Sequence, residues 1–205
     1  MATPVFQRTA LDPEEAYFIM TKIEELGFIP NKYVQGFRTL DTDKKFQDLE
    51  PNISTTLPIW MVIELHKKKL GEVLLPKWFS LEELKKARQM ERNSLLLSPL
   101  PFYWFEMSKL FLELAPPQDA KSLEEIKLIR QDLKDIRYTK LQSTLQTVLN
   151  NSHEALLKNP ETNISVFFNH LDIPNMGCFE ISQFRHILSF LSSKYKRFDS
   201  SNPTE

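Results

Sequence analysis

The residue types that most often carry out chemistry are few in this chain, and their spacing fits no familiar site. None of the four histidines has a second histidine or a cysteine at metal-ligand spacing on a predicted helix; they are His66, His153, His170 and His186. Cys178 and His186 could be imagined as a nucleophile and its base, but no strained turn or oxyanion-hole motif accompanies them. We therefore expect a buried structural thiol at Cys178, no metal and no catalytic site.

Two further patterns are interpreted in the same way. The chain has only four glycines, too few for a phosphate-binding loop or a dinucleotide fingerprint, so no cofactor is expected. Carboxylates and cations also alternate along one segment, namely Glu124, Glu125, Asp132 and Asp135 with Lys127, Arg130, Lys134 and Arg137. Spacings of three and four residues pair opposite charges on a helix, which predicts a solvated face rather than an acid–base pair.

The overall charge provides no attraction to nucleic acid. There are 26 basic and 27 acidic residues, for a net charge of -1. The basic groups at 67–69 and at Lys194, Lys196 and Arg197 could contact phosphates, although helix-end charges explain them about as well. The aromatic run 102–105 has no interleaved Lys or Arg, so core packing explains it better than base stacking.

No feature predicts export or membrane insertion. The amino terminus lacks the basic start and apolar core of a signal peptide, and no 18-residue apolar run occurs. We therefore expect a soluble, intracellular protein that makes no membrane contact.

The first 58 residues predict one helix followed by short strands. Asp12 and Pro13 are typical of a helix start, and Gly27 predicts its end. Tyr17, Met20 and Ile23 should form its apolar face. From 28 to 59, Pro and Gly interrupt short runs at 33–34 and 37–40, with a polar turn at 41–45, which is typical of a small sheet.

The remaining sequence predicts a series of helices. The second helix begins at Pro58 and ends at Gly71, and the third is capped by Ser80 and Glu83. The fourth helix runs from the aromatic segment to Leu114, and the fifth begins near Ser122, capped with Glu125, and reaches about residue 150. Two shorter helices follow, at 165–171 and 181–195. This order predicts a mainly α protein, with a helical domain preceded by a small α+β domain. The expected divisions are 1–58, 59–198 and a flexible tail at 199–205.

The fifth helix carries an apolar stripe. Ile126, Ile129, Leu133 and Ile136 share one face, and Leu141, Leu145 and Val148 resume the stripe one residue out of register. A helix this long, on the order of 40 Å, overreaches a compact domain, so part of its face is expected to meet another chain.

Several segments, taken in order, resemble one family. These are Pro58-Ile59-Trp60, Leu74-Leu75-Pro76-Lys77-Trp78, Glu91-Arg92, Pro101-Phe102-Tyr103 with Glu106, Lys109 and Leu110, and then Asp135-Ile136-Arg137 with Lys140-Leu141. Together they resemble subunits of the Psf-two type of the eukaryotic GINS complex. The resemblance covers roughly residues 11–196 and is strongest in the central segments.

The resemblance implies a non-catalytic scaffold in the nucleus. Its partners would be three sister GINS subunits and, through the assembled complex, the MCM helicase ring and its accessory factor, with DNA contacted only within that assembly. On this basis the candidate interface residues are Trp60, Leu75, Trp78, Ile126, Ile129, Leu133 and Ile136. A role in the chain's own core is an equal alternative for each of them.

Two other function classes stay open. A stand-alone helical adaptor that binds a partner helix or peptide predicts a stable monomer. An enzyme with a dispersed site predicts a deep pocket with strongly shifted pKa values.

Overall fold

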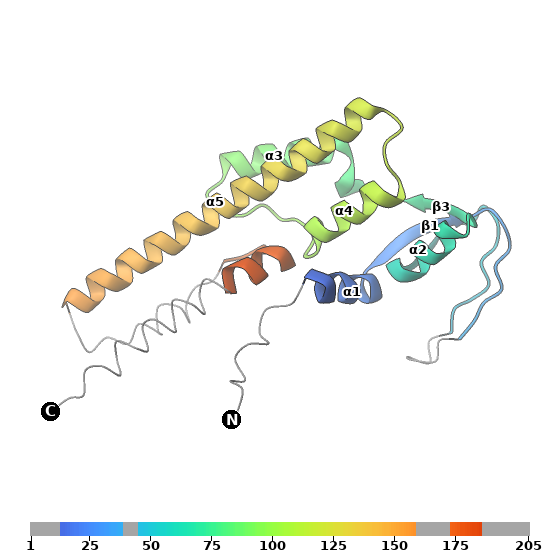
Figure 1. The fold of residues 1–205 in the computed structure, drawn as a ribbon, viewed down its shortest axis with the longest axis horizontal. Helices are drawn as coiled ribbons and strands as arrows, with labels where there is room; N and C mark the ends of the chain where they lie inside the picture. The colour runs from blue at the N-terminus through green and yellow to red at the C-terminus, as the bar shows by residue number, and fades with distance from the viewer. Residues whose placement is uncertain (1–12, 39–44, 159–172, 186–205) are drawn as a thin grey trace, which may run out of the picture. The chain divides into compact units, whose positions relative to one another are not determined.

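The computed structural model describes residues 13–38, 45–158 and 173–185. Their elements are mainly helical, with one small antiparallel sheet near the amino terminus, as the sequence predicted (Figure 1). Backbone contacts divide them into two compact units: 13–84 with 106–127, and 85–105 with 128–158 and 173–185. The expected boundary at residue 58 falls inside the first of these, between β2 and α2. The divisions at 1–58, 59–198 and 199–205 stay a prediction.

The sheet of the first unit has three strands in the order β2-β1-β3, all antiparallel. They are β1 (Glu25–Pro30), β2 (Thr55–Pro58) and β3 (Gly71–Leu74). Alternate residues of β1 are buried, including Leu26 and Phe28. The predicted helix end near Gly27 is therefore wrong: α1 (Pro13–Ile23) ends earlier, because the period-two apolar pattern favours a strand. The predicted cap, Asp12, lies outside the described residues.

The core of this unit lies where α2 (Ile59–Lys67) packs on the strands. α2 contacts all three strands, and α1 packs against α2 and β2. The most deeply buried side chains here include Met20, Phe28, Ile59 and Val62. Of the predicted apolar face of α1, only Met20 is buried, whereas Tyr17 and Ile23 are exposed; the buried face uses Ala16 instead.

The carboxyl end of α2 differs from the prediction. Lys69 has a positive φ of 56°, its N–H donates to the His66 carbonyl at 2.8 Å, and the Leu70 N–H donates to the Leu65 carbonyl at 3.0 Å. This is the Schellman arrangement, built without glycine. Gly71, the predicted helix stop, is the first residue of β3.

The predicted strands at 33–34 and 37–40 are reduced to two isolated bridges, Val34 with Leu49 and Arg38 with Lys45. Too little backbone pairs here to make a ladder. Residues 39–44, which hold the end of the predicted run at 37–40 and most of the predicted turn at 41–45, lie outside the described residues.

The next two helices agree with the sequence. A short 3₁₀ turn, η2 (Lys77–Phe79), precedes α3 (Leu81–Asn93), where the Ser80 hydroxyl accepts the Glu83 N–H at 3.3 Å as predicted for a cap. α4 spans Trp104–Leu114. Within the first unit the Trp78 and Phe79 rings lie 5.8 and 5.2 Å from that of Phe111.

The longest helix, α5 (Ala120–Lys158, 39 residues), begins earlier and ends later than expected. Asp119, not Ser122, caps it: its carboxylate accepts the N–H groups of Lys121 and Ser122 at 3.2 Å and the Ser122 hydroxyl at 3.0 Å. The predicted capping box at Ser122 and Glu125 is therefore wrong. Residues 120–127 belong to the first unit and 128–158 to the second.

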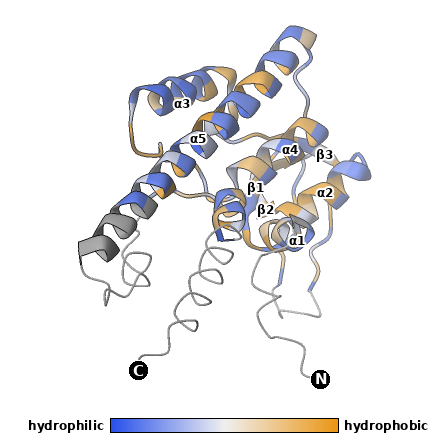
Figure 2. Cartoon of the chain, turned by 60° about the vertical axis from the view of Figure 1, so that its left-hand side comes forward, coloured by the Kyte–Doolittle hydropathy of each residue, from blue (hydrophilic) through white to orange (hydrophobic). Residues whose placement is uncertain are grey.

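In the second unit α3 lies beside α5, and Arg88 joins them by an ion pair to Asp132 at 3.0 Å (Figures 1 and 2). Residues 178–185 are helical, so this segment begins before the predicted 181. Its Phe184 joins a cluster with Leu97, Leu141 and Leu145. The predicted helix at 165–171, and the part of 181–195 beyond 185, lie outside the described residues.

Candidate functional site: a buried ion network and an apolar groove

The buried face of α5 contains an arginine. One face of α5 is buried at spacings of three or four residues, and its apolar members are Ile126, Ile129, Leu133, Leu141 and Leu145. Arg137 occupies the position between Leu133 and Leu141, four residues from each. The Arg137 side chain is 0% exposed. Ile136, which the prediction placed on this stripe, is only half-buried. From Ile126 to Leu145 the stripe therefore runs without a register shift, with a charge at its centre. The side chain of Val148, the last predicted member, lies outside the described residues.

Arg137 uses its guanidinium to join three segments of the second unit. Its Nε and Nη2 donate to the two carboxylate oxygens of Glu180 at 2.6 and 3.0 Å, and Nη1 donates to Glu91 of α3 at 3.2 Å. The remaining bonds reach backbone carbonyls, those of Ser98 at 3.0 Å and Asn175 at 2.6 Å. A bidentate fork of this kind fixes geometry as well as charge.

Glu91 is the second centre of the network. Its side chain is fully buried and accepts from Lys140 Nζ at 2.7 Å. The Ser98 N–H donates to it at 2.9 Å, and the Ser98 hydroxyl donates to the same oxygen. Lys140 also donates to the Leu96 carbonyl at 3.0 Å.

Glu180 is the third centre. Besides Arg137, it accepts from Trp104 Nε1 at 3.2 Å and from the Gly177 N–H. A side chain at Gly177 would be tightly packed: a Cβ there would lie 3.0 Å from Glu180, from the Phe102 carbonyl and from the Trp104 ring. The backbone of 175–180 is thus closely fitted around the carboxylate.

The charges of this network balance, with two carboxylates facing two cations. Burial alone would raise the pKa of Glu91, but hydrogen bonds from Lys140 and Ser98 and the charge of Arg137 hold it below its ordinary value of 4.5. The carboxylate is therefore ionised and fully engaged at neutral pH. Both carboxylates are occupied by structural donors, so the arrangement suits helix positioning rather than proton transfer.

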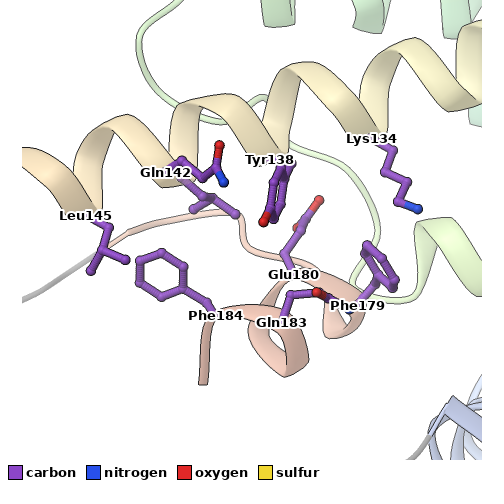
Figure 3. Close-up of a pocket in the computed structure, with 9 residues that line it drawn as sticks. Lys134, Tyr138, Gln142, Leu145, Phe179, Glu180, Gln183 and Phe184 are labelled. Atoms are coloured by element: carbon purple, nitrogen blue, oxygen red, sulfur yellow. The ribbon is translucent and has the colours of Figure 1, made fainter. Parts of the chain in front are cut away.

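An apolar groove lies beside the network, between α5 and residues 178–185 (Figure 3). It is small, with a free volume of about 20 Å³, which is room for about one water molecule. Figure 3 shows side chains from both helices facing one another across it. The lining is mostly apolar, from Tyr138, Leu141, Leu145, Phe179 and Phe184. Glu180 also borders it but is held by Arg137, so these lining residues favour an apolar occupant over chemistry on a substrate.

The predicted interface residues fall into two groups. Ile126, Ile129 and Leu133 are buried by the chain itself, which agrees with the intramolecular alternative. Leu75 is exposed, and Trp60, Trp78 and Ile136 are half-buried. Within the first unit Trp60 lies edge-on to Phe46 at 6.2 Å. As partner contacts, these four stay a prediction.

The predicted charge-paired face of α5 is confirmed for Glu124 and Lys127, which pair at 3.1 Å. Asp132 pairs instead with Arg88 of α3. For Arg137 the prediction is wrong, because its place on the buried stripe takes it out of solvent. In the aromatic run, Tyr103 and Trp104 are buried as core packing predicts and Phe105 is half-buried, but Phe102 is exposed, so the prediction is wrong for that residue.

Cations do approach the aromatic run in space, although none is interleaved in sequence. The Arg130 guanidinium lies 4.5 Å and the Lys134 ammonium 5.3 Å from the Phe105 ring. The basic residues Lys194, Lys196 and Arg197 lie outside the described part of the chain.

Among the described residues, no group of three or more His, Cys, Asp or Glu side chains could hold a metal ion. No helix in the described part is both long and apolar enough to cross a membrane. Cys178 is buried, as predicted for a structural thiol.

Comparison with known families gives a match over the region that contains the network. Residues 78–197 match the Sld5 model, described as the GINS complex protein helical bundle domain. That range includes α3, α4, α5 and every charged member of the network.

Individual relatives extend the likeness to most of the chain. The DNA replication complex GINS protein psf2 of Schizosaccharomyces pombe is 23% identical over 197 residues, 96% of each chain. PSF2 of Candida albicans is 32% identical over 157 residues, 76% of this chain and 75% of the relative. PSF2 of Homo sapiens is 29% identical over 133 residues, 64% of this chain and 70% of the relative. The chain belongs to the PSF2 family of GINS complex proteins.

Proposed function

We propose that this chain is a non-catalytic scaffold subunit of a heterotetrameric GINS complex in the nucleus. In that complex it joins three sister subunits, and the assembly joins the MCM motor and an accessory factor for initiation and elongation of DNA replication. DNA is contacted only within the assembly, since the net charge of -1 gives this chain no general attraction to phosphates.

The observation that carries this proposal is that the charged residues of the network bind one another and the backbone. Glu91, Arg137 and Lys140 lie in segments that resemble GINS subunits, and in space they form one buried network. Their charges hold helices in register and leave no carboxylate of the network free for catalysis. Precise helix placement is what a scaffold surface requires.

The exposed apolar residues also support a subunit of a larger assembly. They include Phe18, Ile23, Leu75, Leu95, Leu96 and Leu128. Stable assemblies bury such surface against partner chains.

A stand-alone adaptor that binds a partner helix or peptide is the second candidate, and the small apolar groove bordered by Leu145, Phe179 and Phe184 is the feature that favours it. The two functions differ in their solution behaviour. Light scattering on the full chain, alone and co-expressed with the three sister subunits, separates them. We expect a 1:1:1:1 complex; a 24.1 kDa monomer that ignores the sisters would contradict the scaffold proposal and favour the adaptor.

A further inference from the structure

The tetrapeptide Ser-Leu-Glu-Glu occurs twice in the first unit, at 80–83 and at 122–125. Both copies fit a helix cap by their spacing, but only Ser80 caps a helix. A serine followed by carboxylates at the second and third positions is also the charge pattern that acidophilic serine kinases select, because their substrate grooves are basic. Since the two sequences are the same, the structure decides which serine can be modified.

Ser80 presents its hydroxyl at the surface. The residue is exposed, and its hydroxyl oxygen accepts the Glu83 N–H at 3.3 Å, which is a long bond. The backbone of Ser80 is extended, with a φ of -66° and a ψ of 150°. No side chain among residues 80–83 is buried, and the first buried one is Leu84. Local opening of this turn therefore exposes little apolar surface, so Ser80 can enter the active site of a kinase at a small cost.

The carboxylates that a kinase would recognise, those of Glu82 and Glu83, are on exposed residues. In a complete capping box Glu83 would accept the Ser80 N–H, but that N–H donates to the Lys77 carbonyl at 3.1 Å. The cap therefore uses the hydroxyl of Ser80 and not the carboxylate of Glu83. Replacing Glu83 by Gln removes the charge and leaves the backbone N–H of the cap in place.

Ser122 has the same following residues in sequence but a different environment. It is half-buried, its hydroxyl donates to the Asp119 carboxylate at 3.0 Å, and its N–H donates to the same oxygen at 3.2 Å. Hydrogen bonds from Lys121 and Ser122 hold the pKa of Asp119 below its ordinary value of 3.8, so this carboxylate is ionised at neutral pH. A phosphate on Ser122 would lie against that negative charge, and Ser122 must first break two bonds to reach a kinase.

We propose that Ser80 is a phosphorylation site for an acidophilic serine kinase, whereas Ser122 in the same tetrapeptide is protected by Asp119. The γ-phosphoryl group of ATP passes to Ser80 Oγ, the hydroxyl proton goes to the catalytic base of the kinase, and ADP leaves. The phosphoserine carries a charge of about -1.5 to -2 at neutral pH. Leu75 and Trp78, two of the predicted partner contacts, come just before Ser80, so the modification adds negative charge next to them in the chain.

Mass spectrometry locates the phosphate without ambiguity. Trypsin releases Ser80 in the peptide 78–85 and Ser122 in the peptide 122–127, and each peptide contains a single hydroxyl side chain. The full-length chain is incubated with Mg²⁺, ATP and a purified kinase that selects Glu at the third position after serine. Synthetic peptides 76–87 and 118–129 are the unfolded reference, in which both serines should be modified at similar rates because the bonds to Asp119 are not formed.

In the full-length chain we expect Ser80 to be phosphorylated at least about tenfold faster than Ser122, since only Ser122 must first break hydrogen bonds to a charged group. Glu83→Gln should slow the modification of Ser80, and the matched change Glu125→Gln should leave it unchanged. Asp119→Ala should raise the rate at Ser122 towards that of its synthetic peptide.

Three results would overturn the proposal. Absence of phosphate from 78–85, while the synthetic peptide 76–87 is modified, would show that the fold hides Ser80. Equal rates at the two serines of the full-length chain would show that Asp119 protects nothing. An unchanged rate at Ser80 in the Glu83→Gln variant would show that no kinase reads this carboxylate.

Discussion

Replacing Arg137 by methionine tests whether the ion network holds the second unit together. The substitution keeps an unbranched, apolar stem but removes all five hydrogen bonds of the guanidinium. Two buried carboxylates, Glu91 and Glu180, then lose their shared counter-charge. Removing one partner of a buried ion pair costs about 3–5 kcal/mol. Set against a typical total of about 5–15 kcal/mol, this is a large fraction of the free energy of unfolding.

Arg92→Met is the matched control. Arg92 also pairs with a carboxylate, Asp132 at 3.4 Å, but its side chain is more than half exposed. An exposed pair contributes at most about 1 kcal/mol, so the control should change stability little. Urea denaturation of the full-length proteins, followed by circular dichroism, gives the free energy of unfolding of each variant. The values can be compared when the dependence of that free energy on urea concentration is the same for both variants.

A small effect of Arg137→Met, within about 1 kcal/mol of the Arg92→Met control, would refute the reasoning. The double variant Arg137→Met with Glu180→Gln adds an internal check. It removes one of the two stranded charges, so its loss should be smaller than the sum of the two single losses by about 1 kcal/mol or more. Strict additivity would mean that the two side chains do not interact.

Three further predictions follow from the same structure. The pKa of Glu91 is lower in the folded protein than its ordinary value of 4.5, so the ionised carboxylate stabilises the fold above that pH, and this stabilisation is lost as the pH falls through the folded-state pKa. In the Glu91→Gln variant, the free energy of unfolding should therefore fall less steeply as the pH is lowered. Gly177→Ala should cost about 1–3 kcal/mol in urea denaturation, because its Cβ meets three groups at 3.0 Å. Asp119→Ala should cost about 1 kcal/mol and Ser122→Ala less, since Asp119 is the cap of α5; equal losses would restore Ser122 to that role.

The helical elements were largely predictable because their signals are local. Ser80 caps α3, as its spacing of three residues from Glu83 indicates. α4 begins within the aromatic run 102–105 and ends before Pro116 and Pro117. The errors arose where two local signals competed. Gly27 fits a helix stop, yet the burial of alternate residues along β1 decides for a strand that pairs with β3, and that partner lies far along the sequence.

Arg137 shows what a single sequence hides about the site. A spacing of four residues from Leu133 leads directly through 137 to Leu141, so the stripe was visible, but an arginine is normally assigned to solvent. Its carboxylate partners are 46 and 43 residues away, in Glu91 and Glu180. Nothing local marks those residues as partners, and only the fold brings them together.

The ion network fixes the position of the backbone in a way that an apolar core at the same place could not. A buried ion pair is weak evidence for stability, because apolar replacements of similar volume are often neutral or better. The Leu97 cluster alone would hold α5 against residues 178–185, but apolar contacts are non-directional. Lys140 and Arg137 instead bind particular carbonyls, at Leu96 and Ser98, and so fix the position of the loop that joins α3 to α4. Charge buried in the unit is thereby used to position uncharged leucines on its surface.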